Sequence, residues 1–128
     1  MTSSFRETKL YFEDMFNQFW ELTPIHFAGE EFNSKGLEKW VNIFYEPTYG
    51  NTADLTCNTN NYGNFHVACW SDVDADSMEL SDYVVSFINE NIDKTKYRIR
   101  RFEVSDHGWN DNNKVFVLIT FSIEMLVA

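Results

Sequence analysis

One stretch of the chain, residues 62–91 (YGNFHVACWSDVDADSMELSDYVVSFINEN), changes its hydrophobic period halfway and therefore constrains the fold most strongly. From Phe65 to Trp70 the side chains alternate with the period of a β-strand. Because both alternating sets are largely apolar, we expect this strand to lie well inside a sheet. From Ser77 onward the apolar residues recur at the spacing of a helix, namely Leu80, Val84, Phe87 and Ile88. A strand, an acidic loop and a helix that packs back on the sheet therefore form the unit that the other segments complete.

An amphipathic helix is also predicted near the start of the chain. Ser4 and Glu7 have the spacing of a capping box, and the helix should run to about Trp20. One face of this helix is strongly aromatic and consists of Phe5, Thr8, Phe12, Met15, Phe16, Phe19 and Trp20. So wide a stripe needs a sheet or another helix to cover it. Residues 25–37 have no sustained period and predict an extended arm with a brief edge strand at Ile25–Phe27.

Three further runs predict strands. Residues 40–46 (WVNIFYE) are β-branched and aromatic and should pair with residues 65–70. Residues 97–104 (YRIRRFEV) predict a strand in which the double Arg100 and Arg101 marks a bulge. The closing run, Val115–Met125, has the strongest alternation. Together the elements predict a single domain over residues 1–128, an α+β fold with a mixed or mostly antiparallel sheet of about four to five strands packed by two amphipathic helices.

Residues 48–62 form a long polar connection rich in Asn, Thr and Gly. Loops of this size within a compact domain tend to be functional or flexible. We therefore expect a mobile hairpin loop here, although a plain solvent-exposed hairpin extension is equally compatible with the sequence. Four side chains are candidates for contact with a partner: Tyr49, Asn51, Asn60 and Tyr62.

The net charge is large, negative and unevenly distributed. Twenty acidic and ten basic residues give a formal charge of −10, which argues against a general nucleic-acid binder. Five of the ten basic residues lie within residues 94–101. Opposed patches of this kind suit head-to-tail self-association, with a solvated strand face as the alternative. Twelve Phe, six Tyr and four Trp indicate either subunit contacts or simply an aromatic core.

The compartment is suggested by what the sequence lacks. Cys57 and Cys69 do not have the spacing of a zinc site and are expected to stay reduced in a cytosol. The first residues (MTSSFRETK) do not form an export signal, and no stretch approaches the ~18 apolar residues of a membrane span. We expect a soluble protein made inside a cell, with no membrane partner.

One motif has the spacing of a metal site but lacks two of the residues that a calcium loop requires. Asp72, Asp74 and Asp76 have the alternate spacing of a calcium loop, but Ser77 stands where glycine is needed and Tyr83 where a bidentate Glu is needed. We therefore expect no metal, and we expect Asp76 or Ser77 to cap the second helix.

Nucleophilic catalysis is not supported either. Cys69 and His66 are three residues apart on one strand and should point to opposite faces. A small cone-shaped enzyme fold that uses His26 or His107 has only scattered polar residues in its favour. No catalytic residue and no cofactor are expected, so the chain is predicted not to be an enzyme.

Several local patterns follow one another in a recognisable order. They are a first helix (FRETKLYFEDMFNQFW), a proline-led arm (TPIHFAGEEF), a strand (WVNIFYE), a long loop, a glycine-led strand (YGNFHVACW), the second helix and a final strand (VFVLITFSIEM). This order resembles that of the tail terminator, or tail completion, proteins of long-tailed, siphovirus-like bacteriophages. The resemblance covers nearly the whole chain and rests on the order of the elements.

The resemblance implies a late structural protein of the virion tail, assembled in the host cytoplasm. It implies a hexameric ring on the head-proximal end of the tail tube, which ends tube polymerisation and forms the head–tail joining surface. The implied partners are further copies of the chain, the tail tube protein and the head–tail connector protein, while DNA passes through the lumen without specific binding. An acidic lumen would repel that DNA.

Charge separation alone, and not the resemblance, nominates a subunit interface. Its candidates are Arg98, Arg100 and Arg101 of one copy against Asp72, Asp74 and Asp76 of a neighbour. The alternative function is an acidic inhibitor, either a DNA mimic or a nuclease immunity protein, which uses carboxylates to fill a basic active site. The arginine-rich strand argues against that alternative.

Overall fold

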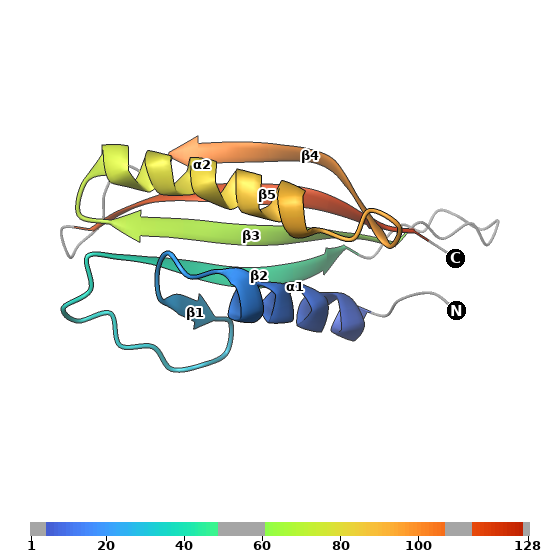
Figure 1. The fold of residues 1–128 in the computed structure, drawn as a ribbon, viewed down its shortest axis with the longest axis horizontal. Helices are drawn as coiled ribbons and strands as arrows, with labels where there is room; N and C mark the ends of the chain where they lie inside the picture. The colour runs from blue at the N-terminus through green and yellow to red at the C-terminus, as the bar shows by residue number, and fades with distance from the viewer. Residues whose placement is uncertain (1–4, 49–60, 107–113, 127–128) are drawn as a thin grey trace.

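The computed structural model describes residues 5–48, 61–106 and 114–126. Its elements are α1 (Phe5–Phe19), β1 (Ile25–Phe27), β2 (Lys39–Thr48), β3 (Asn61–Ser71), α2 (Asp74–Asn91), β4 (Tyr97–Asp106) and β5 (Val115–Met125). Within the described residues, the strands form one five-stranded sheet in the order β1-β2-β3-β5-β4 (Figure 1). β1 is parallel to β2, and the other neighbours are antiparallel. The predicted α+β class, with a mixed sheet and two helices, is confirmed.

The predicted pairing of residues 40–46 with residues 65–70 is confirmed, and the β2–β3 hairpin is longer than predicted. Trp40 lies opposite Trp70, and the pairing continues through Pro47 to Thr48, which lies opposite Tyr62. A proline is tolerated at this point because β1 pairs with β2 only at residues 41–43, so β2 has one described strand neighbour beside Pro47. The predicted mobility of the loop concerns residues 49–60, which lie outside the described residues.

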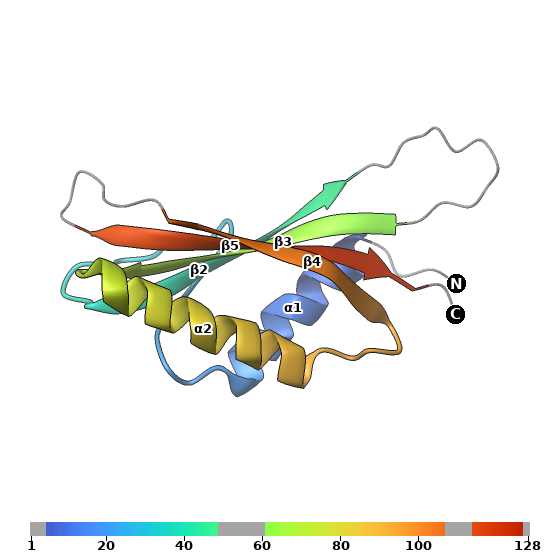
Figure 2. The ribbon, with the colours of Figure 1, turned by 90° about the horizontal axis from the view of Figure 1, so that it is seen from above.

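Both helices pack on the same face of the sheet (Figure 2). α2 lies against β3 and β5, whereas α1 lies against β1 and β2. The fully buried side chains of this layer are Phe12, Phe16, Val41, Ile43, Phe65, Val67, Val84, Ile88, Val117, Ile119, Phe121 and Ile123. Phe19 does not join them and is 59% exposed, so that part of the predicted stripe is wrong. The reason is that Trp20, just after the helix end, packs against Phe16 and Phe87 instead.

Tyr45 and Gly63 make a close contact within this core. The Tyr45 ring lies against the backbone of Gly63, where an added Cβ would stand 2.0 Å from the hydroxyl oxygen. Glycine is therefore needed here because the aromatic ring occupies the space of a side chain. The Tyr45 hydroxyl is buried without a hydrogen-bond partner among the described residues, and burial raises its pKa to about 12.

The other face of the sheet lies opposite the helices, and we call it the open face. Its residues are Trp40, Asn42, Phe44, Glu46, Tyr62, His66, Ala68, Trp70, Phe116, Leu118, Thr120, Ser122 and Glu124. Most of them are partly exposed, in contrast to the alternate residues on the helix side. Of the side chains that the sequence nominated for function, Tyr62 lies on the open face, the arginines lie on β4, and the aspartates lie between β3 and the first turn of α2.

Candidate functional site

A β-bulge brings the three arginines of β4 to the open face. The register shifts between Ile99 and Arg101, which leaves Arg100 as the extra residue. Because of this shift, Arg101 lies opposite Ser122, a residue of the open face, as Arg98 lies opposite another. Simple alternation would have turned Arg101 towards the helices. The bulge that the double arginine predicts is therefore confirmed, and its effect is to concentrate positive charge.

Glu124 of β5 holds two of these arginines. Its Oε1 atom lies 3.0 Å from Nη1 of Arg100 and 3.7 Å from Nη1 of Arg98. The hydrogen bond to Glu124 raises the pKa of Arg100, as does its charge, and Tyr62 contributes in the same direction. Tyr62, nominated as a contact residue, thus lies beside the arginines. The other three nominated residues of that loop, 49, 51 and 60, lie outside the described residues.

The three aspartates gather where β3 passes into α2. Asp72 forms an ion pair with Lys114, which immediately precedes β5. Asp74 interacts with Asp106 at the end of β4, and a hydrogen bond between the two carboxyl groups raises the pKa of Asp74. Asp76 lies in the first turn of α2. Two carboxyl groups therefore lie side by side at the surface, which concentrates negative charge there.

Arginines and aspartates lie at opposite ends of one strand. The arginines lie near the Tyr97 end of β4, and Asp106 with its neighbour Asp74 marks the other end. Ten residues at about 3.4 Å each separate these ends by roughly 30 Å. The nominated groups consequently do not meet within one chain, and any pairing between them requires two copies.

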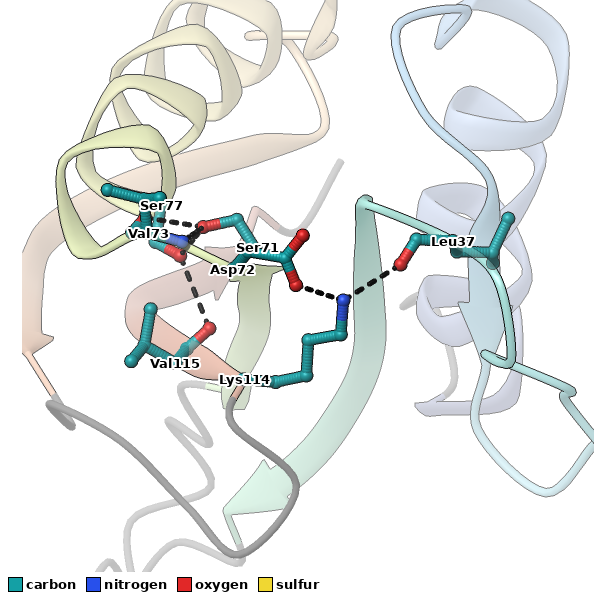
Figure 3. A network of polar contacts seen from close by, with 7 residues as sticks. All are labelled: Leu37, Ser71, Asp72, Val73, Ser77, Lys114 and Val115. Atoms are coloured by element: carbon teal, nitrogen blue, oxygen red, sulfur yellow. Dashed lines mark hydrogen bonds and ion pairs between the residues drawn. The ribbon is translucent and has the colours of Figure 1, made fainter.

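A hydrogen-bond network fixes the corner between β3 and α2 (Figure 3). Ser71 Oγ donates to the Val73 carbonyl at 2.6 Å and lies 2.7 Å from Ser77 Oγ. Ser77 Oγ also donates to the Val115 carbonyl at 3.3 Å. The predicted cap by Asp76 or Ser77 is wrong, because α2 begins at Asp74 and its N-cap, Val73, makes no side-chain capping bond. Ser77 is instead buried and ties α2 to β5.

Stacked aromatic rings cross the open face beside this corner. Trp40 and Trp70 lie on neighbouring strands with ring centroids 5.5 Å apart and planes 7° apart. Phe116 stacks on the other side of Trp70 at 4.5 Å, and Phe32 lies 6.0 Å from Trp40. From the sequence, the strands have apolar residues on both faces, and Trp40, Trp70 and Phe116 are among them. The sequence does not show that they form a continuous row, which depends on the register of three strands.

Lys114 connects this aromatic row to the corner. Its Nζ atom donates to the Leu37 carbonyl at 3.0 Å, pairs with Asp72 and lies 5.8 Å from the centroid of the Trp40 ring (Figure 3). Beside it lies an open cavity of about 510 Å³, lined by Trp40, Trp70, Lys114 and the loop after β1. The arrangement can hold an apolar or aromatic group close to a positive charge.

His26, His66 and the described cysteine have separate structural settings, while His107 lies outside the described residues. Cys69 is buried under the helices, where burial raises the pKa of its thiol to about 12. His66 lies on the open face, where its ring nitrogens contact Thr120 at 2.9 Å and Glu46 at 3.1 Å. Cys69 and His66 are thus on opposite faces, as predicted. His26 contacts the Glu30 carbonyl at 2.9 Å, which is a structural role.

The described residues contain neither a metal-binding cluster nor a membrane-spanning helix. No group of three or more His, Cys, Asp or Glu side chains in the described ranges is arranged to hold a metal ion. Neither described helix is long and apolar enough to cross a membrane.

Comparison with known proteins identifies the fold alone. No protein-family model matches the chain, and no curated protein matches it. A solved structure that has only a serial designation is similar with a TM-score of 0.58, over 96% of this chain and 92% of that chain. The two sequences are 11% identical, so the likeness concerns the arrangement of helices and strands.

Proposed function

We propose that the protein is a structural component of a bacteriophage tail, a terminator that assembles as a ring at the head-proximal end of the tail tube. The proposal starts from the order of sequence elements that resembles this family. The described fold keeps that order, with a helix, a short edge strand, a long hairpin, a second helix and a final hairpin. In this role the ring ends tube polymerisation and presents the surface that joins the head–tail connector protein.

The observation that carries the proposal is the separation of charge along β4. The three arginines lie in the half of the strand nearer Tyr97 and the Asp106–Asp74 pair lies at the other end, about 17 to 27 Å away at about 3.4 Å per residue. When a contact between such unlike ends is heterologous, its repetition either closes into a ring or extends as a filament. A two-fold dimer with antiparallel β4 strands would also bring unlike ends together, and we prefer the ring because it matches the resemblance in the order of the elements.

The outer edge of β4 also supports assembly. No described strand pairs with the side of β4 that faces away from β5. On its helix-side face, Phe102 and Val104 are 46% and 45% exposed. Apolar side chains on an unpaired edge favour association with another chain, while the bulge at Arg100 prevents indiscriminate pairing. Contact with a second copy would cover these side chains.

The remaining partners follow from the same role. The tail tube protein and the connector protein would contact the two ends of the ring, and the 48–62 hairpin is the segment we assign to one of these contacts. DNA would pass through the lumen without specific binding, consistent with a net charge of −10.

Light scattering with purified tail tubes tests the proposal. The protein should stop the growth of tubes at substoichiometric amounts, because one ring is enough to close one tube end. Unchanged growth, together with a tight complex between the monomer and a nuclease, would instead establish the acidic-inhibitor alternative.

A further inference from the structure

The corner between β3 and α2 presents an apolar side chain between two carboxylates. Val73 is 53% exposed and is flanked by Asp72 and Asp74, both exposed. Its backbone is extended, with φ of −128° and ψ of 132°. The Val73 carbonyl accepts a hydrogen bond from Ser71 Oγ (Figure 3). It also accepts hydrogen bonds from the backbone N–H groups of Asp76 and Ser77. The corner is therefore held rigidly and is ordered before it meets any partner.

A pocket of complementary character lies at the other end of α2. It has a volume of about 320 Å³, and its lining includes the apolar side chains of Ile92, Ile99 and Leu126. Lys94 and Arg98 also line it, and the Arg98 side chain is 60% exposed. The pocket thus combines an apolar surface with the positive charge of Lys94, and Arg98 contributes to its lining while its guanidinium lies 3.7 Å from Glu124 on the open face. The corner combines an apolar knob with two carboxylates.

The walls of this pocket are also fixed in advance. Asp93 accepts hydrogen bonds from the turn that follows α2, and those from the side chain and backbone of Thr95 lower its pKa most strongly. The Leu126 N–H donates to the Lys96 carbonyl at 2.8 Å, which holds the end of β5 against the turn. Tyr11 of α1 accepts the N–H of Asp93 at 2.7 Å. Little ordering is therefore required when the pocket is filled.

We propose that the corner of one copy, with Val73 as its knob, docks in the Lys94–Arg98 pocket of the next copy. This inference rests on the proposed function, in which the chain assembles with itself. Asp72 and Asp74 then face Lys94 and Arg98 across the contact, so opposite charges surround a buried apolar centre. The two surfaces lie at the two ends of an 18-residue helix, about 27 Å apart.

The Asp74–Asp106 pair makes contact between the corner and a positively charged partner favourable. The hydrogen bond to Asp106 raises the pKa of Asp74 most, desolvation adds to this, and the repulsion between the two carboxyl groups when both are ionised contributes least. A cation from another copy relieves that repulsion. Asp72 is already paired with Lys114, so Asp74 is the carboxylate expected to respond most to a partner.

Two single variants test the docking, each damaging one of the two surfaces. Val73→Arg places a cation on the knob, and Lys94→Glu places an anion in the pocket. Each variant alone should weaken self-association about tenfold or more in sedimentation velocity experiments. A one-to-one mixture should form a dimer that does not grow, because each variant retains one intact surface. Leu22→Arg and Lys35→Glu are matched controls at exposed positions outside both surfaces and should assemble like the wild type.

The outcomes separate the docking from the proposed function. If the wild type and both variants assemble fully, or if the mixture stays monomeric, the docking is overturned. The proposed ring is not overturned by either result. If the wild type is monomeric in solution, its binding to the ends of tails that lack the protein is compared with the binding of the two variants. The wild type should bind there, and both variants should fail to bind. A wild type that binds no tail and forms no oligomer overturns both proposals. Asp74→Lys is a second corner variant that keeps the test valid if Val73→Arg unfolds, since it also removes the Asp74–Asp106 repulsion.

Discussion

The contact between Tyr45 and Gly63 gives the sharpest test of the fold. Replacing Tyr45 with Phe keeps the ring and removes a buried hydroxyl that has no hydrogen-bond partner in the described part of the chain. A buried, unpaired polar group costs on the order of 1–3 kcal/mol. Tyr45→Phe should therefore raise the free energy of unfolding by about 1 kcal/mol. Tyr62→Phe, which removes a hydroxyl near Arg100 on the open face, is the matched control and should not stabilise the protein.

Replacing Gly63 with Ala should do the opposite. The new Cβ would stand 2.0 Å from the Tyr45 hydroxyl oxygen, 2.4 Å from Cζ and 2.5 Å from Cε1, so the ring has to move. Overpacking of this kind costs about 1–3 kcal/mol, and we expect the upper part of that range. Most of the cost should remain in a Tyr45→Phe background, because the ring carbons still overlap the new methyl group. It should fall by at least about 1 kcal/mol in a Tyr45→Val background, where the ring is absent.

Urea unfolding followed by tryptophan fluorescence measures all of these free energies, provided that the m-values agree among the variants. Loss of about 1 kcal/mol or more in Tyr45→Phe would show that the hydroxyl has a partner. An unchanged stability of Gly63→Ala would show that the ring does not lie over the glycine. Either result would refute the packing described for this part of the core.

Two further predictions concern the Cys69 thiol and the stacked tryptophans. The pKa of the Cys69 thiol is raised from 9.0 to about 12, so the unfolded chain loses this proton first, and stability should fall as the pH rises from 9 towards 12. The loss is about 4 kcal/mol at most, and Cys69→Ala should show a shallower decline in alkaline urea titrations than the wild type. In a Cys57→Ser background, the Cys69 thiol should react with a thiol reagent only on unfolding; fast reaction in the native state would contradict its burial. Trp40→Ala should cost about 3–5 kcal/mol and remove the exciton signal of the stacked Trp40–Trp70 pair from the circular dichroism spectrum, whereas an unchanged signal would argue against the stacking.

The sequence predicts the framework well because hydrophobic periods report directly on burial. Alternation in Val115–Met125 matches the observed burial of every second residue. The pairing of residues 40–46 with residues 65–70 and the bulge near Arg100 were also predictable. In each case a local pattern is sufficient, since a strand face or an extra residue is visible in consecutive letters.

The features that the sequence did not predict depend on contacts between distant segments. The aromatic row of Trp40, Trp70 and Phe116 exists only because three strands have a particular register. Ser77 looks like a helix cap, yet it is buried against Val115, thirty-eight residues away in the chain. The sequence identified the charged residues but not their separation in space, because only the topology places the aspartates and arginines towards opposite ends of β4.

Electron microscopy of tails assembled with and without this protein tests the central claim most directly. If the protein is a tail terminator, tails made without it should lose their uniform length and fail to join heads, and adding the purified protein should restore joining. Tails of normal length that join heads in its absence would contradict the claim.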